Sequence, residues 1–139
     1  MMNGKIKLII DSDLSDVFLI GLSVNRICLE IPVSEIDAYQ IEVCVVEAVN
    51  NTIKHAYGSE KGHEVEVLID MDVESITFHI CDTGKKMETG KKPTLEFDPE
   101  DRENCPEGGM GLFIMHQVMD EVKYSSSQGR NVLALTKHF

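Results

Sequence analysis

The sequence predicts a single α+β domain: a two-layer sandwich with helices on one face of a mainly antiparallel, mixed sheet. Two pairs of segments alternate apolar and polar residues around short turns, which is typical of antiparallel hairpins. Three other segments carry apolar residues at helical spacing, and each needs a surface to cover its apolar side. At 139 residues without internal repeats, the whole chain, 1–139, fits one domain.

The chain is expected to open with a strand over 5–13, which ends in turn-forming residues. A helix follows over 14–31, because its apolar residues recur every three or four positions. Ser12 or Ser15 can cap its start, and Pro32 ends it.

A longer helix is expected over 35–57. Ser34 precedes it and Asp37 stands three positions later, an arrangement that satisfies the first free amides of a helix. Gly58 ends the helix, because glycine readily adopts the left-handed conformation found at many helix ends.

The second half of the chain holds two hairpins, a helix and a long loop. Strands over 63–72 and 75–84 form the first hairpin, a helix covers 111–122, and a second hairpin covers 123–139. The segment 85–108 between them is rich in charge, Pro and Gly. A stretch of this length in a compact domain is either a functional lid or disordered.

The charge of the chain limits the class of partner. Its formal net charge is −11, which argues against binding a nucleic-acid backbone, because such binding depends on clustered Lys and Arg. A single nucleotide remains compatible, since its site needs only local donors and a metal ion. Protein partners with basic faces are favoured by charge complementarity.

The four cysteines, Cys28, Cys44, Cys81 and Cys105, form no C-x-x-C pair. Three of them lie in apolar runs, so we expect buried free thiols and a reducing compartment. The N-terminus has no signal-like apolar segment, and no run of about 18 apolar residues occurs. The sequence therefore predicts a cytoplasmic protein that does not enter the membrane.

A narrow polar stripe interrupts the apolar helix over 35–57. At about 100° per residue, Glu47, Asn51 and Lys54 fall within an arc of about 60°. One interpretation is a solvated side of the helix. The other is the lining of a cleft, in which the amide oxygen ligates a hard cation, the carboxylate acts as a general base and the ammonium group contacts phosphate.

Two further segments are compatible with nucleotide binding. Asp82 ends an apolar strand close to Gly84, which is typical of a turn. The carboxylate can also accept a hydrogen bond from an amino group such as that of adenine, and the glycine lets a flat ring approach the backbone. Gly108, Gly109 and Gly111 precede a helix, where they suit either a tight loop or an anion at the helix N-terminus.

In chain order, these segments resemble the N, G1 and G2 boxes of the GHKL ATPase superfamily. Within it, the chain resembles the bacterial anti-sigma factors that are serine/threonine protein kinases. The matching residues are E-A-V-N-N-T-I-K-H-A-Y (47–57), D-T-G (82–84) and E-G-G-M-G-L-F-I-M (107–115). The likeness covers nearly the whole chain, and it implies a GHKL-type ATP-binding fold in which 85–108 is the ATP lid.

The resemblance assigns a role to each matched position. It implies that Glu47 is the base that activates the attacking hydroxyl, that Asn51 is a ligand of Mg²⁺, and that Asp82 accepts the adenine amino group. The residues implied to bind ATP are Asn51, Lys54, Asp82, Gly84, Met87, Gly108, Gly109, Gly111 and Leu112.

The implied function is that of an ATP- and Mg²⁺-dependent serine protein kinase. The resemblance implies that it binds a sigma factor, phosphorylates an anti-anti-sigma partner on serine, and forms a homodimer. The first helix, including Arg26, is implied as the partner-binding region. A detached histidine-kinase domain is a further reading, but such domains usually carry Asn where this chain has Glu47.

Two positions depart from the pattern of the family. Lys86 replaces the second glycine of D-x-G-x-G, and Glu107 stands where some relatives carry Arg before G-x-G. The alternative function is therefore an ATP-binding, partner-switching module of the same fold without kinase turnover.

Overall fold

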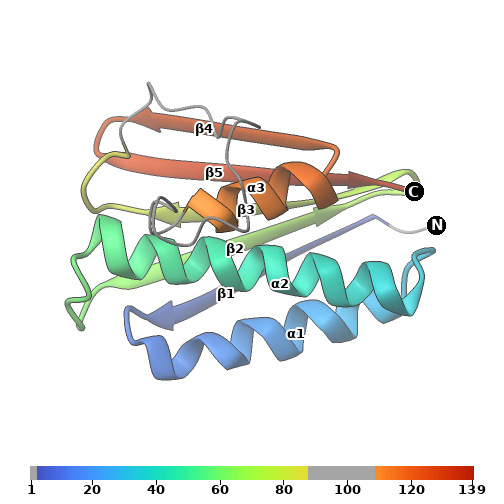
Figure 1. Cartoon of the computed structure of the whole chain (residues 1–139), viewed down its shortest axis with the longest axis horizontal. Coiled ribbons are helices and arrows are strands. Elements are labelled where there is room, and N and C mark those ends of the chain that lie inside the picture. The colour runs from blue at the N-terminus through green and yellow to red at the C-terminus, as the bar shows by residue number, and fades with distance from the viewer. Residues whose placement is uncertain (1–2, 88–108) are drawn as a thin grey trace.

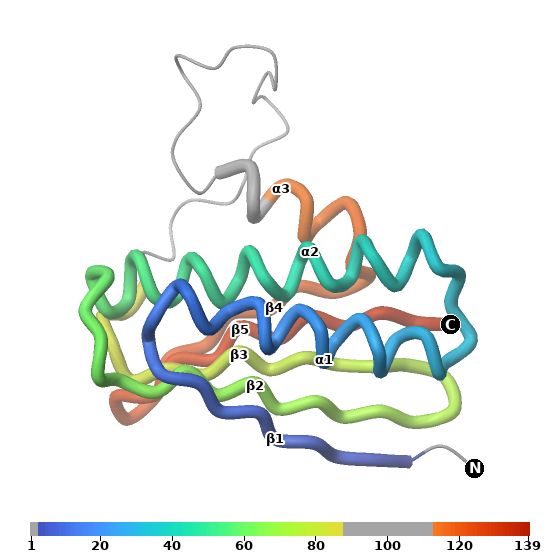
Figure 2. The backbone as a smooth tube through the Cα atoms, turned by 90° about the horizontal axis from the view of Figure 1, so that it is seen from below, coloured from blue at the N-terminus to red at the C-terminus, as the bar shows by residue number. Residues whose placement is uncertain are grey.

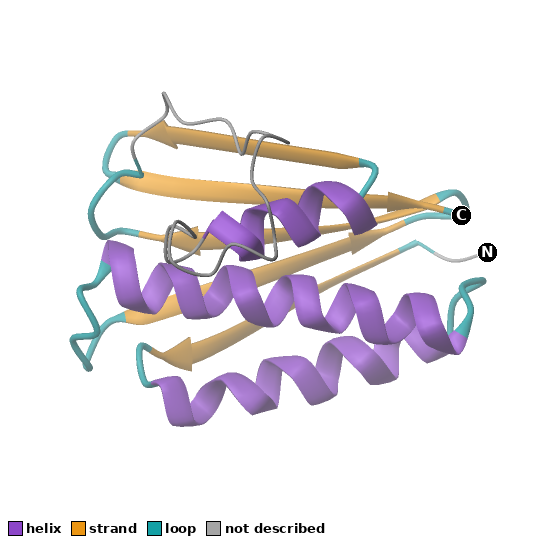
Figure 3. Ribbon diagram, in the orientation of Figure 1, coloured by secondary structure: helices purple, strands orange, loops and turns teal. Residues whose placement is uncertain are grey.

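The computed structural model describes residues 3–87 and 109–139, with only the backbone described for 109–112. Five strands form one sheet, and the helices lie on one of its faces (Figures 1 and 3). The strands are β1 (Gly4–Asp11), β2 (Glu64–Met71), β3 (Ser75–Asp82), β4 (Glu121–Ser127) and β5 (Arg130–His138). The helices are α1 (Val17–Leu29), α2 (Glu35–Asn51) and α3 (Gly109–Val118); a 3₁₀ turn, η1 (Leu14–Asp16), precedes α1, and a π-helical turn, η2 (Thr52–Ala56), continues α2.

The strand order in the sheet is β1-β2-β3-β5-β4. All four neighbouring pairs are antiparallel, so the described strands form a purely antiparallel sheet where a mixed one was expected. One apolar row crosses all five strands in register, through Ile6, Ile69, Phe78, Leu135 and Val122. Because side chains alternate along a strand, this row faces the helices while its neighbours face the open side of the sheet.

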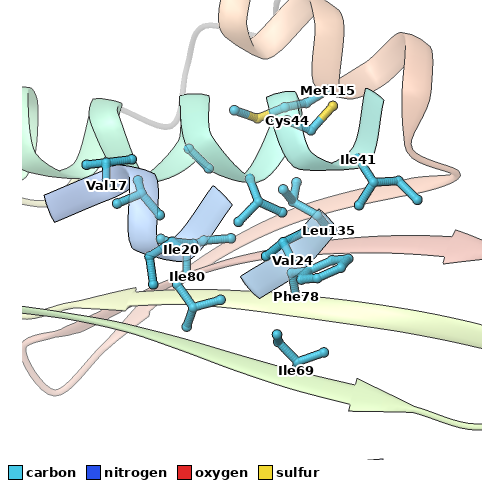
Figure 4. Packing of buried hydrophobic residues seen from close by; sticks show 14 of the residues in the cluster. Val17, Ile20, Val24, Ile41, Cys44, Ile69, Phe78, Ile80, Met115 and Leu135 are labelled. Atoms are coloured by element: carbon cyan, nitrogen blue, oxygen red, sulfur yellow. The ribbon is translucent and has the colours of Figure 1, made fainter. Parts of the chain in front are cut away.

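The core lies between the sheet and α2, which is the central helix of the layer. Ile41, Val45 and Val49 of this helix are fully buried, at the spacing of one helical side. On the side away from α1, Cys44 lies next to Met115 of α3 (Figure 4). Burial of such side chains contributes about 1.5–3 kcal/mol each, so packing holds α2 in place against the sheet.

Local signals explain most of the helix and hairpin ends. The predicted cap of α2 is confirmed, because the Ser34 hydroxyl accepts a hydrogen bond of 3.0 Å from the Asp37 amide. The β4–β5 turn is Gln128–Gly129, with positive φ at both residues (53° and 76°), as a tight hairpin turn requires.

The predicted cap of the first helix is wrong. Asp13 caps η1, since its carboxylate accepts from the Ser15 amide at 3.0 Å. Ser12 instead donates its hydroxyl to the Glu60 carbonyl at 2.6 Å and ties the α2–β2 loop to the end of β1.

Three of the cysteines are buried free thiols, as expected: Cys28, Cys44 and Cys81. Burial raises the pKa of Cys28 to about 12 and that of Cys44 to about 11, so both stay protonated at neutral pH. Cys105 lies outside the described residues. Within the described ranges, no helix is both long enough and apolar enough to cross a membrane.

Candidate functional site

Glu47 and Asn51 lie one turn apart near the end of α2, and both side chains are partly exposed. Neither makes a hydrogen bond or ion pair with another residue that the structure describes. No described protein group therefore competes with a ligand for their side-chain oxygens.

The helix does not stay regular beyond Asn51. In η2 the Tyr57 amide donates to the Thr52 carbonyl at 3.2 Å, five residues back, which is the π-helical pattern. The 100° spacing that grouped Lys54 with Glu47 holds only for an α-helix, and Lys54 lies in the π turn, so that spacing no longer fixes its position relative to Glu47. Lys54 is exposed. Single π turns of this kind are frequent at functional sites.

The H-A-Y end of this helix holds the D-T-G segment in place. Tyr57 is buried, and its hydroxyl donates to the Glu64 carbonyl at 2.7 Å and accepts from the Thr83 amide at 3.0 Å. The Lys85 amide donates to the Ala56 carbonyl at 2.8 Å. Two motifs that lie about 25 residues apart in sequence are thus joined by one backbone–backbone hydrogen bond, from Lys85 to Ala56, and by one from the Thr83 amide to the Tyr57 side-chain hydroxyl.

Gly84 is required by this docking. A Cβ atom at Gly84 would lie 2.3 Å from the Ala56 carbonyl oxygen and 2.7 Å from its carbon. These are backbone atoms of η2, which cannot swing aside as a flexible side chain can. The expected role of Gly84, close approach of a flat ring, stays a prediction; the observed reason for glycine is close approach of the helix end.

Asp82 is both a turn former and a candidate ligand. Its Oδ1 accepts from the Gly84 amide at 2.9 Å, the local hydrogen bond of an Asx-turn. The same Oδ1 accepts from the Asn131 side-chain amide at 2.7 Å. Oδ2 has no partner in the described part of the chain.

Asn131 of β5 is the site residue that sequence reasoning missed. It is buried, at 2% exposure, and lies directly opposite Asp82 in the β3–β5 register. An Asn at the start of a hairpin strand suggests only a turn, because its role here depends on which residue lies opposite it in the sheet. A search for polar residues across from Asp82 would have required the strand order.

The segment after the D-T-G turn crosses the end of the sheet toward β4. The Met87 amide donates to the Tyr124 hydroxyl at 2.9 Å, and the side chains of Lys85, Lys86 and Met87 are exposed. The predicted contact of Met87 with the adenine ring therefore remains a prediction. Gly108 and the rest of the predicted lid, 88–108, lie outside the described residues.

Helix α3 lies beside α2 and runs in the opposite direction (Figures 1 and 2). Cys44, which lies one turn before Glu47 on α2, has its thiol 3.9 Å from the Ile114 carbonyl oxygen of α3. The first turn of α3, which contains Gly109, Gly111 and Leu112, is thus directed toward the part of α2 that carries the polar stripe. This is the arrangement needed for helix-end amides to face phosphate.

The predicted site residues that the structure describes gather at one end of the molecule. The ends of α2 and β3 and the start of β5 lie at this end, and the first turn of α3 is directed toward it (Figures 1 and 2). A cavity of about 500 Å³ lies at the opposite end of β2 and β3 and is lined by none of these residues. Its lining includes Lys5, Asp70, Asp72 and Thr77.

Comparison with known proteins identifies the family. The family model of the histidine kinase-like ATPase domain matches residues 10–137. The serine-protein kinase RsbW of Listeria monocytogenes is 30% identical over 140 residues, which cover 99% of this chain and 88% of that protein. The RsbW of Bacillus velezensis is 28% identical over 88% of this chain and 78% of that protein.

Two other matches cover a smaller share of the related protein. The serine-protein kinase RsbW of Oceanobacillus iheyensis is 33% identical over 92 residues, so 64% of this chain spans 58% of that relative. A crystal structure of the RsbU and RsbW domains of Rv1364c from Mycobacterium tuberculosis matches 96% of this chain and 32% of that one. Its TM-score of 0.67 at 14% identity shows a shared fold. The chain therefore belongs to the histidine kinase-like ATPase family, in the branch that contains the RsbW serine-protein kinases.

Proposed function

We propose that this chain is an ATP-dependent serine protein kinase and anti-sigma factor. It holds a sigma factor and transfers the γ-phosphoryl group of ATP to a serine of an anti-anti-sigma protein. The observation that carries the proposal is the docking of the D-T-G turn on the H-A-Y helix end through Tyr57 and Ala56. This docking supports the proposal that the carboxylate of Asp82 and the polar stripe of α2 belong to one site.

The base end of the nucleotide is assigned to Asp82. Oδ1 of this residue is engaged by two N–H donors, which leaves Oδ2 to accept from the adenine 6-amino group. The phosphate end is assigned to the stripe on α2 and to the first turn of α3, where Gly109, Gly111 and Leu112 lie. Lys54 supplies a positive charge to this end.

The donor set on α2 fits Mg²⁺ bound together with a triphosphate. The described residues contain no cluster of three or more His, Cys, Asp or Glu side chains that could hold a metal alone. Mg²⁺ commonly takes one or two protein oxygens and completes its shell with phosphate oxygens and water. Asn51 offers an amide oxygen for this purpose, and the ion, when bound, offsets phosphate charge.

The chemical step asks little covalent work of the chain. Glu47 accepts the proton of the serine hydroxyl as the serine oxygen bonds to the γ-phosphorus. The bond between that phosphorus and the β,γ-bridging oxygen breaks, and ADP leaves. The role of the fold is to hold the donor, the hydroxyl and the Glu47 carboxylate in line.

The partner surface is assigned to α1 and its surroundings. Phe18 and Leu22, one turn apart, are 59% and 63% exposed, which is unusual for side chains of this size on one side of a helix. Arg26 follows one turn later and pairs with Glu30 at 3.2 Å. The proposal includes a homodimer and a cytoplasmic location.

The test is transfer of phosphate to a protein substrate. The full chain is incubated with Mg-ATP and an anti-anti-sigma protein of the same organism, and phosphoserine is located by mass spectrometry. We expect one phosphorylated serine on the partner. We also expect the chain to release the sigma factor as unmodified partner is added. ATP binding without any phosphoserine would favour the second candidate function, an ATP-binding switching module without kinase turnover. The exposed Lys86, which replaces the second glycine of D-x-G-x-G, is the observation that favours this candidate.

A further inference from the structure

The strands β3 and β5 are joined at the site end by an unusually complete polar network. The Asn131 side-chain nitrogen lies 2.7 Å from Asp82 Oδ1 and 3.0 Å from the Gly84 carbonyl oxygen. The Asn131 side-chain oxygen accepts from the Ser126 hydroxyl at 2.7 Å. Both amide hydrogens and the amide oxygen of a residue that is 2% exposed are therefore in use.

The orientation of the Asn131 amide follows from its partners. An ionised carboxylate and a carbonyl group are acceptors only, so the group that faces both Asp82 and Gly84 must be the NH₂. A flipped amide would set its oxygen against two acceptors and its NH₂ against Ser126. The network thus has one low-energy arrangement, and it clamps the D-T-G turn from the β5 side.

The clamp makes the two oxygens of Asp82 unequal. Oδ1 receives Asn131 and the Gly84 amide, which fill its two acceptor positions. Oδ2 has no partner among the described residues, and no fully buried side-chain oxygen there lacks one, so Oδ2 reaches the surface of the protein. Asp82 as a whole is only 8% exposed. One carboxylate oxygen is thus presented at a fixed angle in an otherwise buried residue.

We infer that Asn131 is a positioning residue that sets the selectivity for the nucleotide base: it locks the Asp82 carboxylate so that Oδ2 alone faces a ligand and accepts from its 6-amino group. The inference rests on the proposed function, because it takes the ligand to be an adenine nucleotide. Asn131 acts through Asp82, since its own donors are already used. Without the lock, the carboxylate can rotate and form the same hydrogen bonds with either oxygen or with water.

The test is a ligand–protein double-mutant cycle. Dissociation constants for ATP and for purine riboside 5′-triphosphate, which lacks the 6-amino group, are measured by calorimetry for wild type and Asn131→Ala. A hydrogen bond to a charged group predicts a wild-type preference for ATP on the order of 10- to 100-fold. For Asn131→Ala we expect the preference to fall to within about threefold, chiefly through weaker ATP binding.

Two further variants separate positioning from general loosening of the sheet. Thr136→Val removes another side-chain hydrogen bond between the same strands, the partly buried one of 3.0 Å between the Thr77 and Thr136 hydroxyls, away from the site. It should lower the melting temperature and leave the ATP preference unchanged. Asn131→Asp keeps the shape but sets a second carboxylate against Asp82, so it should lose the preference at least as fully as Asn131→Ala.

Each outcome bears on the inference. If Asn131→Ala and Asn131→Asp keep the wild-type preference, Asn131 has no positioning role and the proposed function stands. If Thr136→Val reduces the preference as much as Asn131→Ala does, the effect is general loosening and the inference is overturned. If wild type binds neither triphosphate, the proposed function fails and the inference fails with it.

Discussion

Glu47→Gln is expected to lower serine phosphotransfer by roughly 100- to 10,000-fold, the range for loss of a general base. Its affinity for Mg-ATP should stay within about threefold of wild type. The substitution keeps the size of the side chain and its place on α2 but removes the group that takes the serine proton. Glu47 makes no hydrogen bond to another described residue, so no structural partner is lost with its charge.

The measurement is a single-turnover assay with excess kinase, run beside a calorimetric titration of the same sample. Glu42→Gln is the matched control, since it removes the same charge from the same helix on the side that packs against Gly21 of α1. It should transfer phosphate at the wild-type rate. Glu47→Gln with wild-type turnover would mean that another group is the base.

Gly84→Ala is expected to have the largest effect on the architecture of the site. The added methyl group would lie 2.3 Å from the Ala56 carbonyl oxygen, so either the D-T-G turn or the end of η2 must shift. A shift there breaks the 2.8 Å hydrogen bond from Lys85 to Ala56 and moves the residues that hold Asp82. Overpacking of this kind costs about 1–3 kcal/mol, which corresponds to roughly 3–12 °C in Tm.

Loss of ATP binding should accompany the loss of stability, by at least about tenfold, because Asp82 and Gly84 share one turn. Gly4→Ala is the control: a Cβ there meets only Met71 Cγ at 3.7 Å, an ordinary contact. It should change neither Tm nor ATP affinity. A Gly84→Ala protein with wild-type Tm and affinity would contradict the tight docking of the turn on the helix.

The elements of this fold could be read from the sequence because their signals are local. Apolar periodicity placed α1, α2 and the hairpins, and the Ser34 cap lies within three residues of its partner. The failed cap at Ser12 has a tertiary reason, since its hydroxyl bonds to Glu60, 48 residues away. The π turn η2 was also hidden, because side-chain spacing alone cannot distinguish one widened turn from a continued α-helix.

The candidate site divides in the same way. Its residue types and their order predicted Glu47, Asn51 and Asp82, because the motifs are short and linear. The reason for Gly84 and the existence of the Asn131 clamp depend on which strand lies beside β3. That neighbour is β5, whose residues pair with β3 residues 49 (Asp82 with Asn131) to 63 (Ser75 with His138) positions earlier in the sequence, and no local pattern encodes these pairs.

The most direct test of the central claim, that one site at the joined ends of α2 and β3 binds Mg-ATP, is a titration followed by ¹H–¹⁵N spectra. We predict saturable shifts at the amides of Asn51 and Gly84 and at the side-chain NH₂ of Asn131. The amides of Lys5 and Ser75, beside the distant cavity, should not move. Asp82→Ala should show no shifts at ATP concentrations that saturate wild type. Wild-type shifts confined to the amides of Lys5 and Ser75, or no wild-type shifts at all, would contradict a shared Mg-ATP site.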